Sequence, residues 1–371
     1  MLLCPVCESI FPAGTYDRCP QDGAPLYVFG EGEVKRPHEP GDVVAHKYEI
    51  IEEIARRGGA GRTFRARQTH LDREVELRIL PADSLNKPGD HARFQREVET
   101  WGKLRSDYLV RLYDSGFTED GAPYMALEYV PGGTLGQRLR IAGPLADAHL
   151  RIVAEHALRA LAAAHEAGVL HRDISPDALV LGKRADGRPY CRLTGFGLAK
   201  IMDDMEDDPT AITMTGQTIG NPAYMAPETM MQGILEPRTD LYGLGVTLYE
   251  LATARRPFPG DSLADLLAFH VRGVPAPIRQ FRPDLDAALK AVIEGLLEKN
   301  PAARFQSAGH ALAKLEDELA AWPDALDALA PAAPMQLPGW HPTRQRPRWL
   351  PWALVSLAAI LLGVVLGLVL Y

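Results

Sequence analysis

The chain has 371 residues, of which 46% are hydrophobic, so it can bury the core of two domains or of one large two-lobed domain. Its formal net charge of −8 argues against a general nucleic-acid-binding protein, which normally carries an excess of basic residues. The 4 cysteines do not suggest a disulfide framework, because three of them cluster near the start of the chain. The composition therefore favours a globular protein with a metal site near its N-terminus.

The N-terminal cysteines have a spacing typical of metal ligands. Residues 1–27 carry Cys4 and Cys7 as a C-x-x-C pair, then Cys19 followed by Asp22 at the fourth position. This segment resembles a small zinc ribbon, in which two tight turns give tetrahedral ligation. We expect a structural zinc ion held by three thiolates and one carboxylate, since aspartate oxygen is a permitted ligand. The alternative is a degenerate ribbon with free thiols.

Strand-like and helix-like stretches follow a linker predicted over residues 28–44. Short apolar stretches with strand character come first, and longer helical patterns come after them. The predicted strands are 48–54, 62–67 and 74–80, and the predicted helices are 92–104, 150–166 and 311–321. These elements place one domain over residues 45–320.

Three motifs occur in a fixed order inside this domain. They are His171-Arg172-Asp173, Gly195-Phe196-Gly197 and Ala226-Pro227-Glu228. In this order they resemble the core of a protein kinase of the bacterial serine/threonine (eukaryotic-like, Hanks) type. The resemblance covers residues 45–320 and implies an α+β, two-lobed protein kinase fold behind the zinc ribbon.

Several residues that kinases use are retained, and the resemblance assigns each of them a role. Asp173 matches the base that accepts the proton of the substrate hydroxyl, and Arg172 matches the arginine that binds an activation-loop phosphate. Glu97 matches the helix glutamate that pairs with the strand lysine in active kinases. Glu128 and Val130 lie in a sequence that resembles the interlobe hinge beside the nucleotide.

Three further matches concern the scaffold. Asp240 resembles the buried aspartate that braces the catalytic loop. Glu228 and Arg304 resemble the ion pair that ties the end of the activation segment to the large lobe. These matches support the fold and say nothing about turnover.

The departures from the family pattern fall on nucleotide chemistry. In the phosphate-binding loop, of pattern G-x-G-x-x-G, Arg56 takes the first position and Gly58 and Gly61 remain. Arg78 replaces the strand lysine; it keeps a charge for the helix glutamate, but a planar guanidinium does not substitute for an ammonium group at the phosphates. Glu76 replaces the alanine that roofs the adenine pocket, where a carboxylate is bulky and costly to desolvate.

The expected magnesium ligands are also replaced. Gly195 stands where the family has the aspartate that holds magnesium, and Ala178 stands where it has the asparagine that binds a second metal ion. Ser175 replaces the lysine that stabilises the transferred phosphoryl group, and Asn221 replaces a threonine that touches the catalytic aspartate. Asp177, next to Ala178, is an alternative metal ligand, although a neighbouring residue usually points elsewhere.

The segment after the second motif has an acidic run at 203–208, which is most simply a solvated loop. Thr213, Thr215 and Thr218 follow it, where bacterial kinases are often phosphorylated. Phosphorylation by a partner kinase is one hypothesis, with Arg172 binding the phosphate.

The C-terminal part of the chain predicts a membrane anchor. Residues 321–350 are rich in Pro and Ala and suit a spacer, and 351–371 form an uncharged apolar segment long enough to span a bilayer as one helix. Arginines precede that helix, so the preceding domains are predicted to lie in the cytoplasm, on the cytoplasmic membrane. Gly363 and Gly367 match a helix-pairing pattern, which leaves a homodimer as one alternative.

Three functions remain open from the sequence. The first is a membrane-anchored pseudokinase that acts as a scaffold or allosteric regulator in bacterial phosphosignalling, with signalling proteins such as an active kinase as partners. Its degenerate site argues against Mg-ATP binding and catalysis, while zinc is its expected cofactor. The second is a weakly active, ATP-dependent serine/threonine kinase that uses Asp173 as its base. The third is a zinc-ribbon adaptor on a kinase-fold platform. None of them requires nucleic acid.

Overall fold

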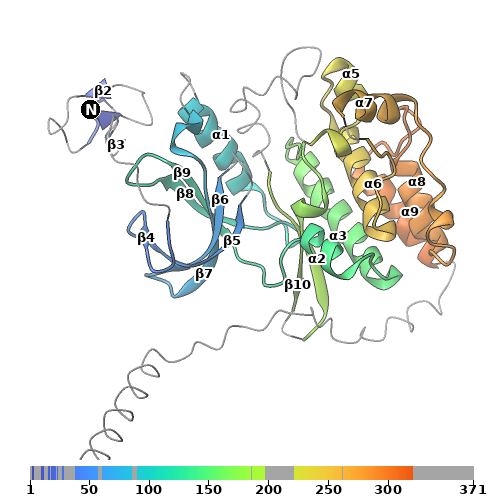
Figure 1. Ribbon diagram of the computed structural model, residues 1–371, viewed down its shortest axis with the longest axis horizontal. Coiled ribbons are helices and arrows are strands. Elements are labelled where there is room, and N and C mark those ends of the chain that lie inside the picture. The colour runs from blue at the N-terminus through green and yellow to red at the C-terminus, as the bar shows by residue number, and fades with distance from the viewer. Residues whose placement is uncertain are drawn as a thin grey trace, which may run out of the picture. The chain divides into compact units, whose positions relative to one another are not determined.

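The computed structural model describes residues 38–56, 61–85, 90–184, 186–196, 221–260 and 262–320, with short N-terminal stretches at 2–3, 10–11, 16, 18–21, 23 and 27–28. From residue 38 onward, the described chain forms a strand-rich small lobe and then a helical large lobe (Figure 1). The predicted two-lobed α+β architecture is therefore confirmed.

The small lobe is built on a six-stranded antiparallel sheet. Its strands, in spatial order, are β4 (Val43–Val44), β5 (Tyr48–Arg56), β6 (Arg62–Gln68), β7 (Arg73–Ile79), β9 (Pro123–Glu128) and β8 (Leu112–Phe117). Val75, Leu77 and Ile79 of β7 are buried in a core that belongs to the small lobe alone. Because side chains alternate along a strand, the residues between them face the other side of the sheet.

Helix α1 (Asp90–Lys103) packs against the sheet and follows the short turn η2 (Ala82–Leu85) (Figure 1). Its buried residues Phe94, Val98 and Trp101 recur at helical spacing. They belong to the same continuous core as the helices of the large lobe. Helix α1 therefore joins the small lobe to the large one through apolar packing.

The large lobe is mostly helical. Its helices are α2 (Leu135–Ala142), α3 (Asp147–Glu166), α5 (Pro227–Gln232), α6 (Pro237–Thr253), α7 (Leu263–Arg272), α8 (Ala287–Leu296) and α9 (Ala308–Ala320), with the short turns η3 (Pro176–Ala178), η4 (Pro222–Tyr224) and η5 (Ile278–Gln280). Helix α6 is buried along nearly its whole length, and α3 and α8 pack against it. Thr134 and Gln137 form a capping box that fixes the start of α2 next to the catalytic loop.

A two-stranded hairpin, β10 (Leu179–Lys183) and β11 (Pro189–Leu193), lies where the lobes meet. Leu193 N–H donates to Tyr108 O and Val110 N–H donates to Leu193 O, both at 2.9 Å. These bonds attach the end of β11 to the segment that follows α1. The chain just after β11 is therefore held between the two lobes.

The buried ion pair predicted for Glu228 and Arg304 is confirmed. Arg304 Nη1 lies 2.8 Å from Glu228 Oε1, and Nη2 lies 3.1 Å from Oε2, in a bidentate arrangement. The side chains are 0% and 7% exposed. Arg304 also donates to the carbonyl oxygens of Arg238, Glu298 and Lys299, so the pair ties α5 to the start of α6 and the end of α8.

The predicted strands and helices are found with small shifts at their ends. The strands predicted at 48–54, 62–67 and 74–80 are β5, β6 and β7. The helix predicted at 92–104 is α1, and the later helices predicted at 150–166 and 311–321 are α3 and α9. Periodicity was sufficient for these elements because each has one clearly apolar face.

Near the N-terminus, three two-residue strands pair in the order β2-β1-β3: β1 (Leu2–Leu3), β2 (Ile10–Phe11) and β3 (Tyr27–Val28). In the part of the chain that the structure describes, no helix is long and apolar enough to span a bilayer. The predicted membrane helix at 351–371 and the spacer at 321–350 lie outside the described residues.

Candidate nucleotide and catalytic site

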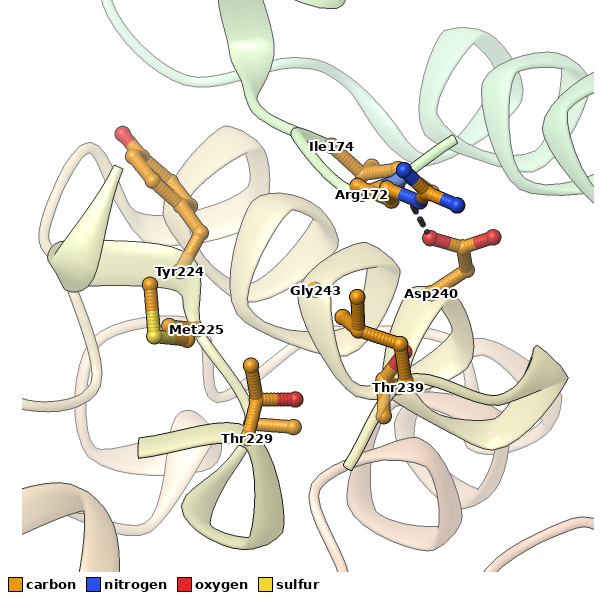
Figure 2. Close-up of a pocket in the computed structure, with 10 residues that line it drawn as sticks. Arg172, Ile174, Tyr224, Met225, Thr229, Thr239, Asp240 and Gly243 are labelled. Atoms are coloured by element: carbon orange, nitrogen blue, oxygen red, sulfur yellow. Dashed lines mark hydrogen bonds between the residues drawn. The ribbon is translucent and has the colours of Figure 1, made fainter. Parts of the chain in front are cut away.

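Asp240 braces the catalytic loop, residues 171–178, as the sequence predicts. The Asp240 carboxylate, which is buried in α6, accepts a hydrogen bond from His171 N–H at 2.9 Å. It accepts a second from Arg172 N–H at 2.8 Å, and Figure 2 shows this contact between Asp240 and Arg172. His165 Nε2 lies 2.8 Å from the same carboxylate. Arg172 has φ +72°, a conformation rare outside glycine, and the two backbone bonds hold it there.

The Arg172 side chain reaches a small pocket next to this brace. Tyr224, Met225, Thr229 and Thr239 also line the pocket (Figure 2). Arg172 Nε is buried, and the described part of the chain offers it no hydrogen-bond partner. The threonines proposed as phosphate sites, Thr213, Thr215 and Thr218, lie outside the described residues, so their pairing with Arg172 stays a prediction.

Two hydrogen bonds fix the position of Asp173, the residue predicted to be the catalytic base. Its Oδ1 accepts a hydrogen bond from Asn221 N–H at 3.2 Å, and its own N–H donates to His171 Nδ1 at 3.3 Å. The Asn221 side chain does not replace the family threonine here, because its Oδ1 accepts from Ala223 N–H and caps η4. The contact to Asp173 is thus made by the backbone N–H, which every residue type except proline provides.

His171 is buried as a neutral ring. Burial lowers the pKa of His171, because a charged imidazolium would be poorly solvated there. Its Nε2 donates to Thr194 O at 2.9 Å, which leaves Nδ1 to accept from Asp173 N–H. The Phe196 ring packs edge-on against it, with centroids 4.6 Å apart. The catalytic loop and the residues after β11 are therefore assembled in one packed unit.

The two expected magnesium positions offer no ligand. Gly195 has φ +96°, and among the described residues a Cβ added to it would meet nothing nearer than the His171 ring, 4.0 Å away. Glycine supplies no side-chain oxygen at this position. Ala178 is buried and also lacks a side-chain donor.

Asp177 does not replace the missing asparagine. Its Oδ1 accepts from Thr134 Oγ1 at 2.6 Å, and a Cβ added to Gly136 would overlap the carboxylate. Arg140 lies 3.6 Å from Oδ2. The carboxylate is therefore turned toward the start of α2, and the alternative in which it binds a metal in place of Ala178 does not fit.

An ion pair lies on the face of β7 that is turned away from the core of the small lobe. Arg78 Nε and Nη2 both lie 2.6 Å from Glu76 Oε1, and Nη2 also donates to Thr194 Oγ1 at 3.1 Å. The two charged side chains are 12% and 15% exposed. Glu76 is thus partly buried and paired, so the desolvation cost expected for it is offset by Arg78. The predicted partner Glu97 is half-buried on α1.

The remaining nucleotide-site positions have roles within the fold. Gly61 has φ +97°, and a Cβ there would lie 2.5 Å from Ile79 O, so strand packing requires this glycine whether or not a phosphate binds. The Glu128 carboxylate forms an ion pair with Arg192 of β11, and its N–H donates to Arg111 O at 2.8 Å. Val130 is buried in the main core. Gly58 lies outside the described residues.

Comparisons with known proteins agree with this geometry. A family model described as the protein kinase domain matches residues 48–314. This chain belongs to the protein kinase family. Serine/threonine-protein kinase pkn3 of Myxococcus xanthus is 38% identical over 74% of this chain and 50% of that protein. PknB of Mycobacterium leprae, also a serine/threonine-protein kinase, is 33% identical over 70% of this chain and 41% of its own length.

The kinase match extends to solved structures. The kinase domain of Mycobacterium tuberculosis PknI covers 76% of this chain and 100% of its own, with a TM-score of 0.56 at 23% sequence identity, a likeness that concerns the fold. The predicted membership in the bacterial serine/threonine kinases is confirmed. The chain spans half or less of the length of the two curated relatives.

Kinases of this family normally use Mg-ATP, and the residues present here do not fit it. Gly195 and Ala178 provide no side-chain oxygen for magnesium, and the Arg78 guanidinium is engaged by Glu76 and Thr194 instead of being directed at phosphates. In the described part of this kinase domain, no group of three His, Cys, Asp or Glu residues could hold a metal ion.

Sequence reasoning missed Thr194 and the pairing of Glu76 with Arg78. Glu76 and Arg78 are two residues apart in one strand, and side chains alternate along a strand. This spacing was sufficient to place both charges on one face. Thr194 gave a weaker signal: it is a polar residue after the apolar strand that contains Cys191 and Leu193. A buried hydroxyl needs a partner, but the sequence does not say which one.

Proposed function

We propose that this kinase-family protein is a pseudokinase, a scaffold or allosteric regulator in bacterial phosphosignalling. The observation that carries the proposal is the contrast between two sets of residues. Asp240, Glu228 and Arg304 keep the contacts that build the kinase fold. The positions expected to bind magnesium carry no side-chain ligand. The arginine at the phosphate-binding position, Arg78, is hydrogen-bonded to Glu76 and Thr194 instead.

Magnitudes favour loss of activity over a modest reduction. Phosphoryl transfer depends on positioning and on charge stabilisation by metals and cations. Loss of one electrostatic donor typically lowers the rate ~100- to 1000-fold. Here the strand lysine, the catalytic-loop lysine and both metal ligands are replaced, and such losses need not add. Asp173 alone would give negligible transfer.

We expect Mg-ATP at millimolar concentration to raise the melting temperature of the wild-type protein by less than about 1 °C. A variant with restored family residues, Glu76→Ala, Arg78→Lys, Ser175→Lys, Ala178→Asn and Gly195→Asp, is expected to gain about 5 °C or more, because a ligand at ~100 times its Kd contributes ~2.7 kcal/mol. Thermal-shift titration with and without Mg²⁺ measures both. A large, metal-dependent shift of the wild-type protein would count against a pseudokinase.

The second candidate function is an atypical, weakly active kinase. The contacts of Asp173 support this alternative. Asp173 is held by Asn221 N–H, and the packed His171 and Phe196 resemble an assembled catalytic core. This candidate requires phosphate transfer by the wild-type protein that Asp173→Asn abolishes. Transfer that survives Asp173→Asn would point instead to a contaminating kinase.

We also propose that the N-terminal segment binds a structural zinc ion. Cys19 Sγ accepts a hydrogen bond from Gln21 N–H at 3.4 Å, and Gly23 N–H donates to Cys19 O at 2.9 Å, a tight turn that suits a metal-binding thiolate. Cys4, Cys7 and Asp22 lie outside the described residues.

Elemental analysis of the purified protein is expected to find about one zinc ion per chain, because three thiolates and a carboxylate complete a tetrahedral site. Cys19→Ser should remove most of the zinc, whereas Cys191→Ser, in a buried core position, should leave it in place. Wild-type protein free of zinc would rule the site out. The third candidate, a zinc-ribbon adaptor, additionally requires that deletion of residues 1–27 abolishes partner binding.

A further inference from the structure

Three polar groups meet at the junction of the two lobes. Arg78 and Glu76 belong to β7 of the small lobe, and Thr194 directly follows β11 in the large lobe. Arg78 Nη2 bridges the Glu76 carboxylate, at 2.6 Å, and the Thr194 hydroxyl, at 3.1 Å. One guanidinium therefore contacts both lobes.

The local structure makes this contact specific. Residues 76 and 78 share the face of β7 that is turned away from the sheet core, so their side chains lie next to each other. Both are largely removed from water, at 15% and 12% exposed, and a charge in such a setting is costly without its partner. The planar guanidinium of Arg78 directs Nε and Nη2 at Glu76 and Nη2 also at Thr194, so one rigid group contacts both acceptors.

Thr194 is fixed to the catalytic loop on its other side. Its N–H donates to Ala178 O at 2.9 Å, its carbonyl accepts from His171 Nε2 at 2.9 Å, and the side chain is buried. The hydroxyl that Arg78 contacts is therefore a rigid part of the large lobe. A force applied to β7 would be transmitted to the catalytic loop through this bond.

We propose that Arg78, Glu76 and Thr194 form an internal latch that holds the two lobes together in one closed arrangement. In kinases the lobes close around a bound ligand. In this protein the same position is spanned by the chain's own charges, so the closed surface is presented to partners whether or not nucleotide is available. The inference rests on the proposed pseudokinase function and specifies how that function is made independent of ATP.

The test is amide hydrogen exchange of the full-length protein over residues 76–80 and 191–196. Arg78→Met and Thr194→Val are each expected to speed exchange in both segments about tenfold, because a hydrogen bond to a charged group is lost. The double variant should exchange no faster than the faster single variant, since the two substitutions remove one shared contact. Thr194→Ser keeps the hydroxyl and should stay within about twofold of wild type.

Arg62→Met is the matched control, because it removes an arginine whose ion pair with Glu53 lies within the small lobe. It should leave residues 191–196 unchanged. Additive effects of Arg78→Met and Thr194→Val, or slower wild-type exchange on addition of Mg-ATP, would overturn the latch. Phosphate transfer by the wild-type protein, measured separately, would overturn the proposed function without altering the exchange pattern of the variants, so the two failures are distinguishable.

Discussion

Arg304→Ala is expected to destabilise the kinase domain by about 3–5 kcal/mol, the cost typical of breaking a buried ion pair. Its guanidinium makes two bonds to Glu228 and reaches three backbone carbonyl groups, all at a site with almost no solvent. The substitution leaves the Glu228 carboxylate buried without its cation. Urea-induced unfolding, followed by tryptophan fluorescence, measures the loss.

The matched control for this pair is Arg159→Ala. Arg159 pairs with Glu155 and Glu316 at the surface of α3, where all three side chains are at least 35% exposed. Exposed pairs contribute about 0–1 kcal/mol, so this variant should unfold close to wild type. If the two arginine variants lose equal stability, the buried pair is not the anchor that its geometry indicates.

Asp240→Asn is expected to lower stability by about 2–4 kcal/mol and to loosen the catalytic loop selectively. The carboxylate accepts from two backbone N–H groups and contacts His165, and an amide cannot accept as strongly at all three positions. Arg172 would then lose the bond that holds its positive φ. Hydrogen exchange at residues 171–173 should accelerate more than exchange in α3.

Asp177→Asn serves as the comparison for Asp240. Its carboxylate is 41% exposed and contacts Thr134 and Arg140, so an amide can keep the shorter contact. A change below about 1 kcal/mol is expected, as for other partly exposed polar groups. Equal losses of stability in Asp240→Asn and Asp177→Asn would contradict the role of Asp240 as a brace of the catalytic loop.

The fold was largely predictable from the sequence because its signals are local. Alternating apolar residues located β7, and helical spacing located α1 and α3. The scaffold contacts of Asp240 and of Glu228 with Arg304 were also predictable, because the order of the kinase motifs assigns these positions within a known architecture. Such positions are set by the backbone, which changes little when catalytic residues are replaced.

The candidate site was harder to predict because its contacts are new combinations. The motif comparison identified Arg78 and Glu76 as departures but treated them one at a time, with Arg78 directed at Glu97. Their pairing appears only when strand alternation is applied to the substituted residues together. The contact with Thr194 depends on how close the lobes lie, which no local pattern contains.

The backbone conformation at Gly195 also affects which residue type is stable at this position. Its φ of +96° lies in a region that side chains other than glycine occupy only under strain, typically ~1–3 kcal/mol. An aspartate at this place would carry that penalty, although its Cβ would meet no described residue closer than the His171 ring. Glycine in place of the family's aspartate therefore avoids this backbone strain. For the pseudokinase function proposed above, thermodynamic stability therefore favours glycine at this position and opposes a return to aspartate.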